Sequence, residues 1–146
     1  MSDTDATIRH VYEEWHRTVM SADLAGLMVL YADNAVFESP TVLAQFPDRA
    51  DGILRGKAEI AKLFERNFTN LRGEFTDLHR TGLFSDGRVL IWEYPRATPT
   101  GSQVDLFESM DIENGLIAYH RVYWGWQGVK ALLRVQDEQR AQGQRT

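Results

Sequence analysis

The chain has 146 residues, the length of one ordinary domain, and its 43% hydrophobic and 25% charged residues exclude a mostly disordered protein. It has no cysteine, which excludes disulfides, thiol nucleophiles and thiolate metal sites. Sixteen Lys and Arg against twenty-one Asp and Glu give a formal net charge of -5. Because phosphate contacts supply most non-specific nucleic-acid affinity, we expect no nucleic-acid partner.

The N-terminus, Met1–Asp5, is acidic and lacks the basic and then apolar stretch of a signal peptide. No apolar run approaches the length of a membrane span, so we expect a cytoplasmic protein with no membrane partner. The chain shows no linker or repeat before a polar end at 136–146, which should fray. We therefore predict a single domain over 1–146.

Apolar residues at helical spacing predict three helices in the first half of the chain. The first covers about 5–20, the second follows Asp23, and the third begins at Lys57 and buries a face that includes Asn67. The first helix has three candidate N-caps: Asp3, Thr4 and Asp5. A short strand is predicted over 35–38. Residues 41–56 form a long loop, part of which should pack down as a flap.

Strand patterns dominate the second half, with predicted strands over 73–84, 88–96, 102–113 and 116–126. Asp-Gly and Asn-Gly turn signals separate them, and 99–101 joins the two hairpins. An amphipathic segment follows over about 128–140. Helices first and strands later favour an α+β fold: a cone-shaped, curved antiparallel sheet whose concave face is covered by three N-terminal helices, with a pocket at the wide end.

Several short segments carry a resemblance across nearly the whole chain. They are Asp23–Leu27 leading into Tyr31–Phe37, Ser39-Pro40, Gly56, Gly87–Val89 and Asn114–Ile117 leading to Arg121–Tyr123. In this order they resemble the nuclear transport factor 2-like superfamily and, within it, the SnoaL-like group. The resemblance implies a cystatin-like roll. That superfamily contains isomerases, cyclases, dehydratases, epoxide hydrolases and binding proteins, so fold does not fix function.

The known catalytic sets of these relatives are incomplete here. Ser39 stands where ketosteroid isomerases carry an Asp base, and Trp15 stands where they carry an oxyanion-hole Tyr. Glu108 matches, or lies near, their oxyanion-hole Asp and the His of the SnoaL pocket. Val122 replaces the catalytic Asp of SnoaL-type cyclases. The Asp-Arg-Asp set of the epoxide hydrolases is not recognisable.

Strand alternation selects the remaining candidates for chemistry. Glu108 should share a face with Met110, and His120 a face with Val122 and Trp124, while Ile117 should point the other way. The resemblance implies that the His120 face looks into the pocket. A buried Glu beside a His is a plausible general acid–base pair, with His120 as the base and Glu108 as its partner or the acid. The alternative is a purely structural hydrogen-bonded pair.

Glu93 is the third candidate catalytic residue. The length of the turn at 99–101 decides whether Glu93, or instead Trp92 and Tyr94, faces the pocket beside Glu108. Family sequences usually have a large residue at the Glu93 position, which favours Glu93 inside. A solvated Glu93 on the outer face is the alternative.

The four histidines do not have metal-ligand spacing, and no Gly-rich phosphate loop with the required Ser or Thr is present, so neither a metal nor a cofactor is expected. Ser39 has no matching His and Asp partners and is interpreted as a pocket-lining hydroxyl. The expected ligand is a small, apolar, ring-sized molecule. The predicted pocket wall comprises Trp15, Phe37, Ser39, Phe64, Val122 and Trp124.

The second half also carries aromatic residues that need a partner. If they lie on the convex face they form a patch too large to leave in water, and superfamily members commonly dimerise through that face. We therefore expect a homodimer, unless the C-terminal helix covers them. The aromatic residues are Trp92, Tyr94, Tyr119, Tyr123 and Trp126. Three hypotheses follow: a cofactor-free enzyme, a non-catalytic ligand carrier, and a protein-interaction module.

Overall fold

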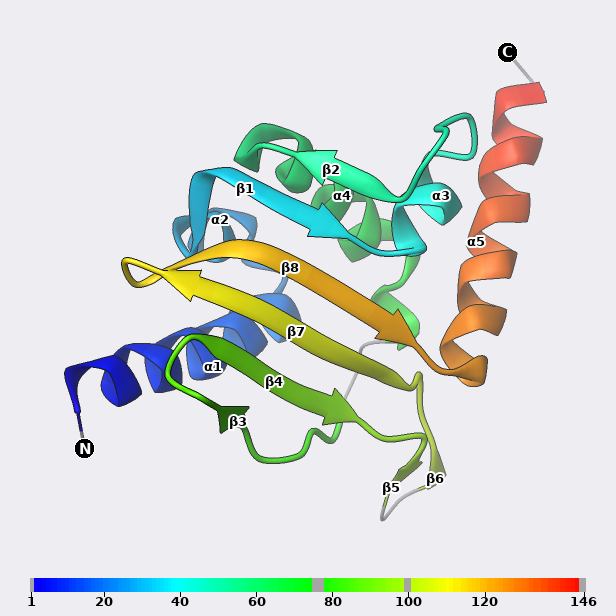
Figure 1. Cartoon of the computed structure of the whole chain (residues 1–146). Helices are drawn as coiled ribbons and strands as arrows, with labels where there is room; N and C mark the ends of the chain where they lie inside the picture. Colours follow the sequence, from blue (N-terminus) through cyan, green and yellow to red (C-terminus); the bar gives the residue numbers. More distant parts are fainter. Residues whose placement is uncertain (1, 75–77, 99–100, 145–146) are drawn as a thin grey trace.

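The computed structural model describes residues 2–74, 78–98 and 101–144, and only the backbone of residues 72, 97, 98, 101 and 102. Six strands form one sheet in the order β2-β1-β8-β7-β4-β3 (Figure 1). Their bounds are β1 Tyr31–Glu38, β2 Ile53–Arg55, β3 Phe84–Ser85, β4 Val89–Tyr94, β7 Leu106–Glu113 and β8 Leu116–Trp124. A separate two-stranded ladder pairs β5, Ala97–Thr98, with β6, Gly101–Ser102.

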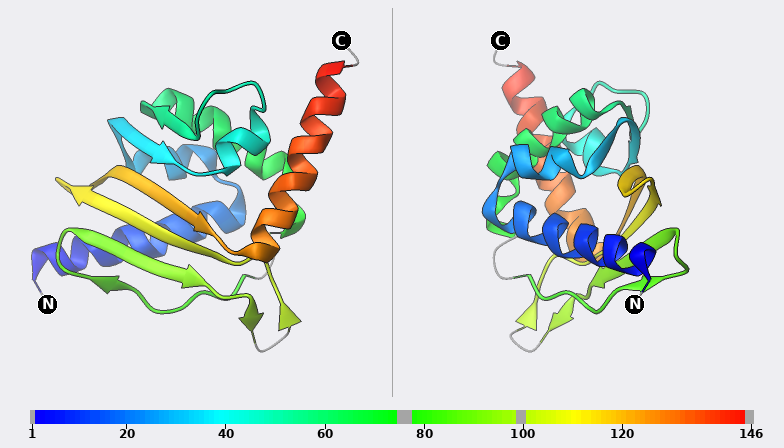
Figure 2. Two further views of the ribbon diagram at one scale, coloured as in Figure 1. Left: turned by 45° about the vertical axis from the view of Figure 1, so that its right-hand side comes forward. Right: turned by 90° about the vertical axis from the view of Figure 1, so that its left-hand side faces the viewer.

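Helices cover one face of this sheet, as Figure 2 shows for α1, α2 and α4. The helices are α1 Asp3–Ser21, α2 Leu24–Val29, α3 Thr41–Gln45, α4 Lys57–Asn70 and α5 Trp126–Gln144, with a 3-10 turn, η1, at Arg72–Glu74. The expected α+β architecture is confirmed; α3 is the one α-helix of the described residues that was not predicted, and α5 corresponds to the predicted C-terminal amphipathic segment. The main core fills the space between these helices and the sheet.

Local chemistry explains the start of the chain. Ser2, and not one of the three predicted residues, caps α1: its hydroxyl accepts from the Asp5 N–H at 3.1 Å, and the Asp5 carboxylate accepts from the Ser2 N–H at 3.2 Å. This reciprocal pair is a capping box. Asp23 caps α2, as predicted, by accepting from the Gly26 N–H at 2.9 Å.

The tight turns of the sheet also follow their sequences. Asn114 and Gly115 have φ values of 52° and 77° and connect β7 to β8. Positive φ at both positions matches the twist of a two-residue hairpin. At the other turn, the Asp86 carboxylate accepts from the Val89 N–H at 2.8 Å and Gly87 has a φ of 94°.

Several predicted boundaries were wrong. Residues 41–56 are not one loop, because they contain α3 and β2. The predicted strand 73–84 forms a strand only at its end, in β3, and its residues 75–77 lie outside the described residues. The predicted joint at 99–101 also lies mostly outside the described residues, because 99–100 are not described. The polar end is helical as far as Gln144, while 145–146 lie outside the described residues.

Two long-range features of the sheet were not predicted. β1 pairs with β8 in parallel, with Phe37 opposite His120, so the sheet is not purely antiparallel. The β7–β8 ladder shifts register between Asp111 and Ile112, because β8 contains one extra residue there. Such a bulge reverses side-chain parity, so Ile117 is buried in the core and not on the outer face as expected.

Candidate functional site

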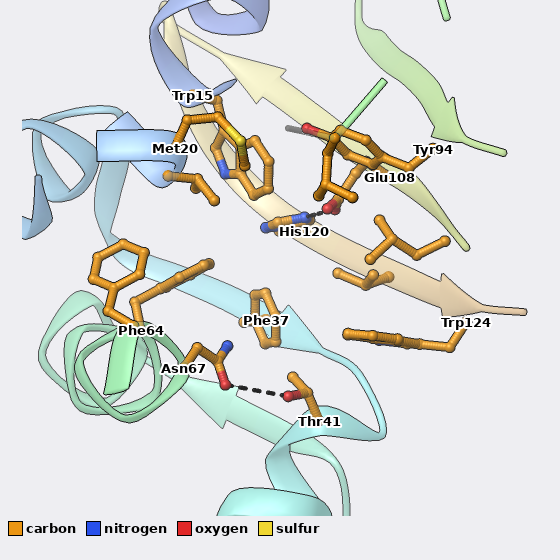
Figure 3. A pocket seen from close by; sticks show the side chains of 15 residues that line it. Trp15, Met20, Phe37, Thr41, Phe64, Asn67, Tyr94, Glu108, His120 and Trp124 are labelled. Atoms are coloured by element: carbon orange, nitrogen blue, oxygen red, sulfur yellow. Dashed lines mark hydrogen bonds and ion pairs between the residues drawn. The ribbon is translucent and has the colours of Figure 1, made fainter. Parts of the chain in front are cut away.

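A narrow cavity of about 30 Å³ lies between α1, α4 and the covered face of the sheet. This volume holds about two water molecules, whereas ligand pockets usually measure at least several hundred cubic ångströms. Three half-buried side chains, Met20, Phe68 and Trp124, come from three different elements and border it. Figure 3 shows the wall. The cavity is lined by Trp15, Val19, Met20, Phe37, Thr41, Phe64, Asn67, Phe68, Leu78, Tyr94, Leu106, Glu108, His120, Val122 and Trp124.

The structure brings Glu108 and His120 together on this wall. Met110 lies opposite His120 on neighbouring strands, so Glu108 is a diagonal neighbour of His120 on the same face. The His120 Nε2 atom is in hydrogen-bond contact with Glu108 Oε2. Glu108 is 3% exposed and His120 is fully buried. The predicted pairing of these two residues is therefore present.

Tyr31 extends the pair into a chain of four side chains. Its hydroxyl lies 2.7 Å from His120 Nδ1 and accepts from Trp15 Nε1 at 3.3 Å. Tyr31 is the first residue of β1, which begins before the predicted strand 35–38, and the parallel β1–β8 pairing brings it to His120. No functional role was predicted for Tyr31 from the sequence, although a buried aromatic hydroxyl is itself a signal of a polar partner.

One assignment of the protons satisfies every group in this chain of side chains. An indole nitrogen only donates, so Tyr31 accepts from Trp15, and the acceptor within reach of its own hydrogen is His120 Nδ1. His120 then carries its proton on Nε2 and donates it to the Glu108 carboxylate. Burial raises the pKa of Tyr31 well above its usual value, the Trp15 bond opposes this, and Glu108 adds to the rise. Tyr31 therefore stays a neutral donor.

This arrangement changes the expected roles. Both ring nitrogens of His120 are engaged by Tyr31 and Glu108, so His120 has no nitrogen left to take a proton from a ligand. Glu108 uses one oxygen for His120, and among the described residues no partner is found for the other. Chemistry at this site would therefore use Glu108 as the base and His120 as the group that orients it.

Aromatic rings surround the pair. The Phe37 ring is edge-on to the His120 ring at 4.8 Å between centroids, and Trp15 is edge-on at 5.7 Å. Phe64 packs against both Phe37 and Trp15. In so apolar a surrounding, the charge interactions of Glu108 are stronger than they would be in water.

Glu93 does not belong to this site. It is exposed on the outer face of β4, while its neighbours Trp92 and Tyr94 are 1% and 2% exposed on the covered face. The expectation of Glu93 inside was wrong, because in the β4–β7 register Trp92 stands directly opposite Glu108. The alternative that Trp92 and Tyr94 face inward is confirmed.

Tyr94 supplies a further hydroxyl at the cavity. Its oxygen lies 2.9 Å from His16 Nδ1 on α1, and the two rings stack at 5.9 Å. Burial, reinforced by the nearby Arg80 charge, lowers the pKa of His16 to about 4. Burial and then Glu108 raise the pKa of Tyr94. Both groups are therefore neutral near pH 7.

Ser39 is buried but does not line the cavity, which corrects its predicted role. Its hydroxyl oxygen accepts from Trp124 Nε1 at 2.9 Å and from the Thr41 N–H at 3.2 Å. Ser39 thus fixes the Trp124 ring at the cavity border. The other five predicted wall residues do line the cavity: Trp15, Phe37, Phe64, Val122 and Trp124.

An amide cluster closes the opposite end. Asn67 Oδ1 accepts from Gln45 Nε2 at 2.8 Å and from the Thr41 hydroxyl at 3.3 Å. Asn67 was predicted on the buried face of the third helix, without a functional role. A polar amide within an apolar stripe was the available signal.

Among the described residues, no group of three or more His, Asp or Glu side chains could hold a metal ion.

The comparisons agree with this architecture. The SnoaL-like domain family matches residues 8–120. Solved structures with this fold include a SnoaL-like protein of unknown function from Burkholderia thailandensis, with 18% identity, a TM-score of 0.65 and coverage of 82% of this chain and 95% of that one. No curated protein matches.

Two further neighbours carry named activities. A steroid delta-isomerase from Pseudomonas aeruginosa is 21% identical, with a TM-score of 0.59 and coverage of 97% and 96%. A LEH-like epoxide hydrolase from M. tuberculosis is 16% identical, with a TM-score of 0.58 and coverage of 88% and 91%. These identities show a shared fold alone. The family match over most of the chain shows that this protein belongs to the SnoaL-like domain family.

Proposed function

We propose that this protein binds a small, mostly apolar molecule in the cavity and that Glu108 transfers a proton on it without a cofactor. The observation that carries the proposal is a desolvated carboxylate on the wall of an apolar cavity, with one oxygen engaged by His120 and the other directed to no described residue. A purely structural core gains little from such a group, because burying a charge is costly unless it is fully paired.

The proposed reaction is a proton transfer at a carbon next to a carbonyl group. The second oxygen of Glu108 takes a proton from a carbon beside a carbonyl group of the ligand; the C–H pair moves to form the enolate, and the protonated Glu108 returns a proton to carbon. The His120 N–H stabilises the carboxylate and fixes its orientation. The isomerase and epoxide hydrolase among the structural neighbours are compatible with cofactor-free chemistry on this fold.

Ligand entry requires the cavity to widen, since about 30 Å³ does not accommodate a ring. The flexible Met20 side chain and the half-buried rings of Phe68 and Trp124 are the groups that would move. A cavity that stays closed favours the interaction-module alternative, and one that opens without chemistry favours a carrier.

Deuterium exchange separates these possibilities without knowledge of the natural substrate. Cyclohexanone in D₂O exchanges the hydrogens next to its carbonyl, and the exchange is followed by proton NMR. We expect the wild-type protein to accelerate this exchange and Glu108→Gln to abolish the acceleration. Glu93→Gln, on the outer face, is the matched control and should behave as wild type. Binding of cyclohexanone without exchange supports a carrier, and no binding contradicts the pocket.

We also propose that the outer face of the sheet joins a second copy of this chain. Trp92 and Tyr94 are buried and do not contribute to it, which corrects the size of the expected patch. Phe107 and Tyr123, 38% and 59% exposed, pair across β7 and β8 with ring centroids 6.3 Å apart. Sedimentation equilibrium should give a dimer that Tyr123→Glu dissociates; a monomeric wild type contradicts this proposal.

A further inference from the structure

Asn67 presents its amide nitrogen to the cavity. The residue is 6% exposed, lines the cavity from α4, and its oxygen is occupied by Gln45 and Thr41. Figure 3 shows the amide oxygen turned to Thr41 and the nitrogen turned to the Phe37 side. Among the described residues, no hydrogen-bond acceptor is found for this nitrogen. The amide nitrogen therefore faces the cavity without a described acceptor.

The orientation of the amide is held by a relay of side chains. Gln45 donates to Asn67 through Nε2 at 2.8 Å and accepts from Asn70 Nδ2 through Oε1 at 2.8 Å. Arg66 Nη1 donates to the backbone carbonyl of Gln45 at 2.7 Å. Buried polar donors are normally satisfied, so a donor fixed in this way and left open toward a cavity marks a place for a ligand acceptor.

Two of the polar groups that line the cavity, Glu108 and Asn67, lie at different ends. Glu108 is on β7 beside His120, and Asn67 is on α4, with the Phe37 ring between them in Figure 3. One end offers the Glu108 carboxylate as an acceptor and base; the other offers the Asn67 amide N–H beside the Thr41 hydroxyl. A ligand that satisfies both must carry an acidic C–H at one end and a hydrogen-bond acceptor oxygen at the other.

We infer that Asn67 is the distal specificity residue of the site and selects bifunctional ligands whose far end is a carbonyl oxygen. This inference rests on the proposed function, because it assumes that the cavity opens to a ligand and that Glu108 faces the reacting end. The Asn67 amide would be a second contact point, or anchor, for the ligand, besides Glu108. Among ligands of the same shape, the protein should therefore bind the one with a distal carbonyl oxygen more tightly.

A pair of probes tests the anchor. Cyclohexane-1,4-dione and 4-methylenecyclohexanone have nearly the same shape and share one ketone, but only the dione has a distal oxygen. The measurement is the ratio of their dissociation constants by NMR titration. We expect Asn67→Asp, which keeps the oxygen that accepts from Gln45, and Asn67→Leu to lower the dione preference of the wild type by about two- to tenfold, the worth of one neutral hydrogen bond.

The same substitution at an exposed position provides the control. Asn34→Asp lies on β1, takes no part in the relay to Gln45 and does not line the cavity, so its ratio should equal that of the wild type. A ratio compares two ligands on one protein, so a variant of lower stability still reports it. An Asn67→Leu ratio equal to that of the wild type overturns the inference.

Failure of the inference and of the proposed function give different results. Deuterium exchange at the shared ketone with no Asn67 effect overturns the anchor and leaves the role of Glu108 standing. An Asn67-dependent ratio without exchange overturns the chemistry and supports the anchor. Binding of neither probe overturns both.

Discussion

The Tyr31 hydroxyl lies 2.7 Å from His120 Nδ1, although 89 positions separate the two residues in the chain. In the tautomer that satisfies all of these groups, this nitrogen accepts the tyrosine hydrogen, and the other nitrogen of His120 carries a proton and faces Glu108. The Tyr31 hydroxyl therefore favours the His120 tautomer whose Nε2–H donates to the buried Glu108 carboxylate.

Removal of the Tyr31 hydroxyl should change the tautomer populations of the His120 ring. In Tyr31→Phe, Trp15 Nε1 loses its acceptor and His120 Nδ1 its donor, so we expect a loss of about 1–3 kcal/mol of unfolding free energy. Nitrogen-15 chemical shifts of His120 should show a protonated Nε2 in the wild type and a mixture in the variant. Tyr119→Phe removes a similar bond, to Glu38, on the outer face and should leave the His120 shifts unchanged.

A double-mutant cycle should reveal strong coupling between Glu108 and His120. His120→Leu leaves a buried carboxylate without its donor and should cost about 3–5 kcal/mol, whereas Glu108→Gln keeps an acceptor and should cost less. The double variant is expected to be more stable than the sum of the single losses predicts. Urea unfolding at pH 7 measures all four proteins, and additive losses would contradict a direct pair.

His16 should make the protein less stable in mild acid. Its pKa is about 4 in the folded protein and near 6.5 when unfolded, so between these values the unfolded chain binds more protons. Stability is then complete above pH 6.5 and decreases as the pH falls toward 4. The slope has an upper limit of about 1.4 kcal/mol per pH unit, and solvent around this half-buried ring reduces it.

Unfolding at a series of pH values measures this effect. His16→Gln should flatten the dependence between pH 4 and 6.5, while His10→Gln, exposed on the same helix, should leave it in place. An unchanged slope in His16→Gln would mean that another group is responsible.

Ser39 should control the cavity border through Trp124. In Ser39→Ala the Trp124 Nε1–H loses its only described acceptor, at a cost of about 1–3 kcal/mol. We expect faster exchange of that indole hydrogen with water, read from its nitrogen-15 correlation. The Trp15 indole, bonded to Tyr31, serves as the internal reference. Equal exchange rates for Trp124 in both proteins would show that Ser39 does not hold the ring.

The sequence determined the features that depend on neighbouring residues. The periodicity of α1 and α4, the Asp23 cap and the Asn114-Gly115 turn are local, and strand alternation placed Glu108 and Met110 on one buried face. The same alternation, together with the family resemblance, led to the pairing of Glu108 with His120.

The tertiary structure decided what depends on register between distant segments. The β4–β7 pairing turned Glu93 outward and Trp92 inward, and a one-residue bulge in β8 buried Ile117. Parallel pairing of β1 with β8 brought Tyr31 to His120 Nδ1, so that Tyr31 and Glu108 together engage both ring nitrogens, which is why Glu108 and not His120 is the proposed base. A shift of one residue in register reverses every side chain of a strand, and single-strand patterns do not contain that information.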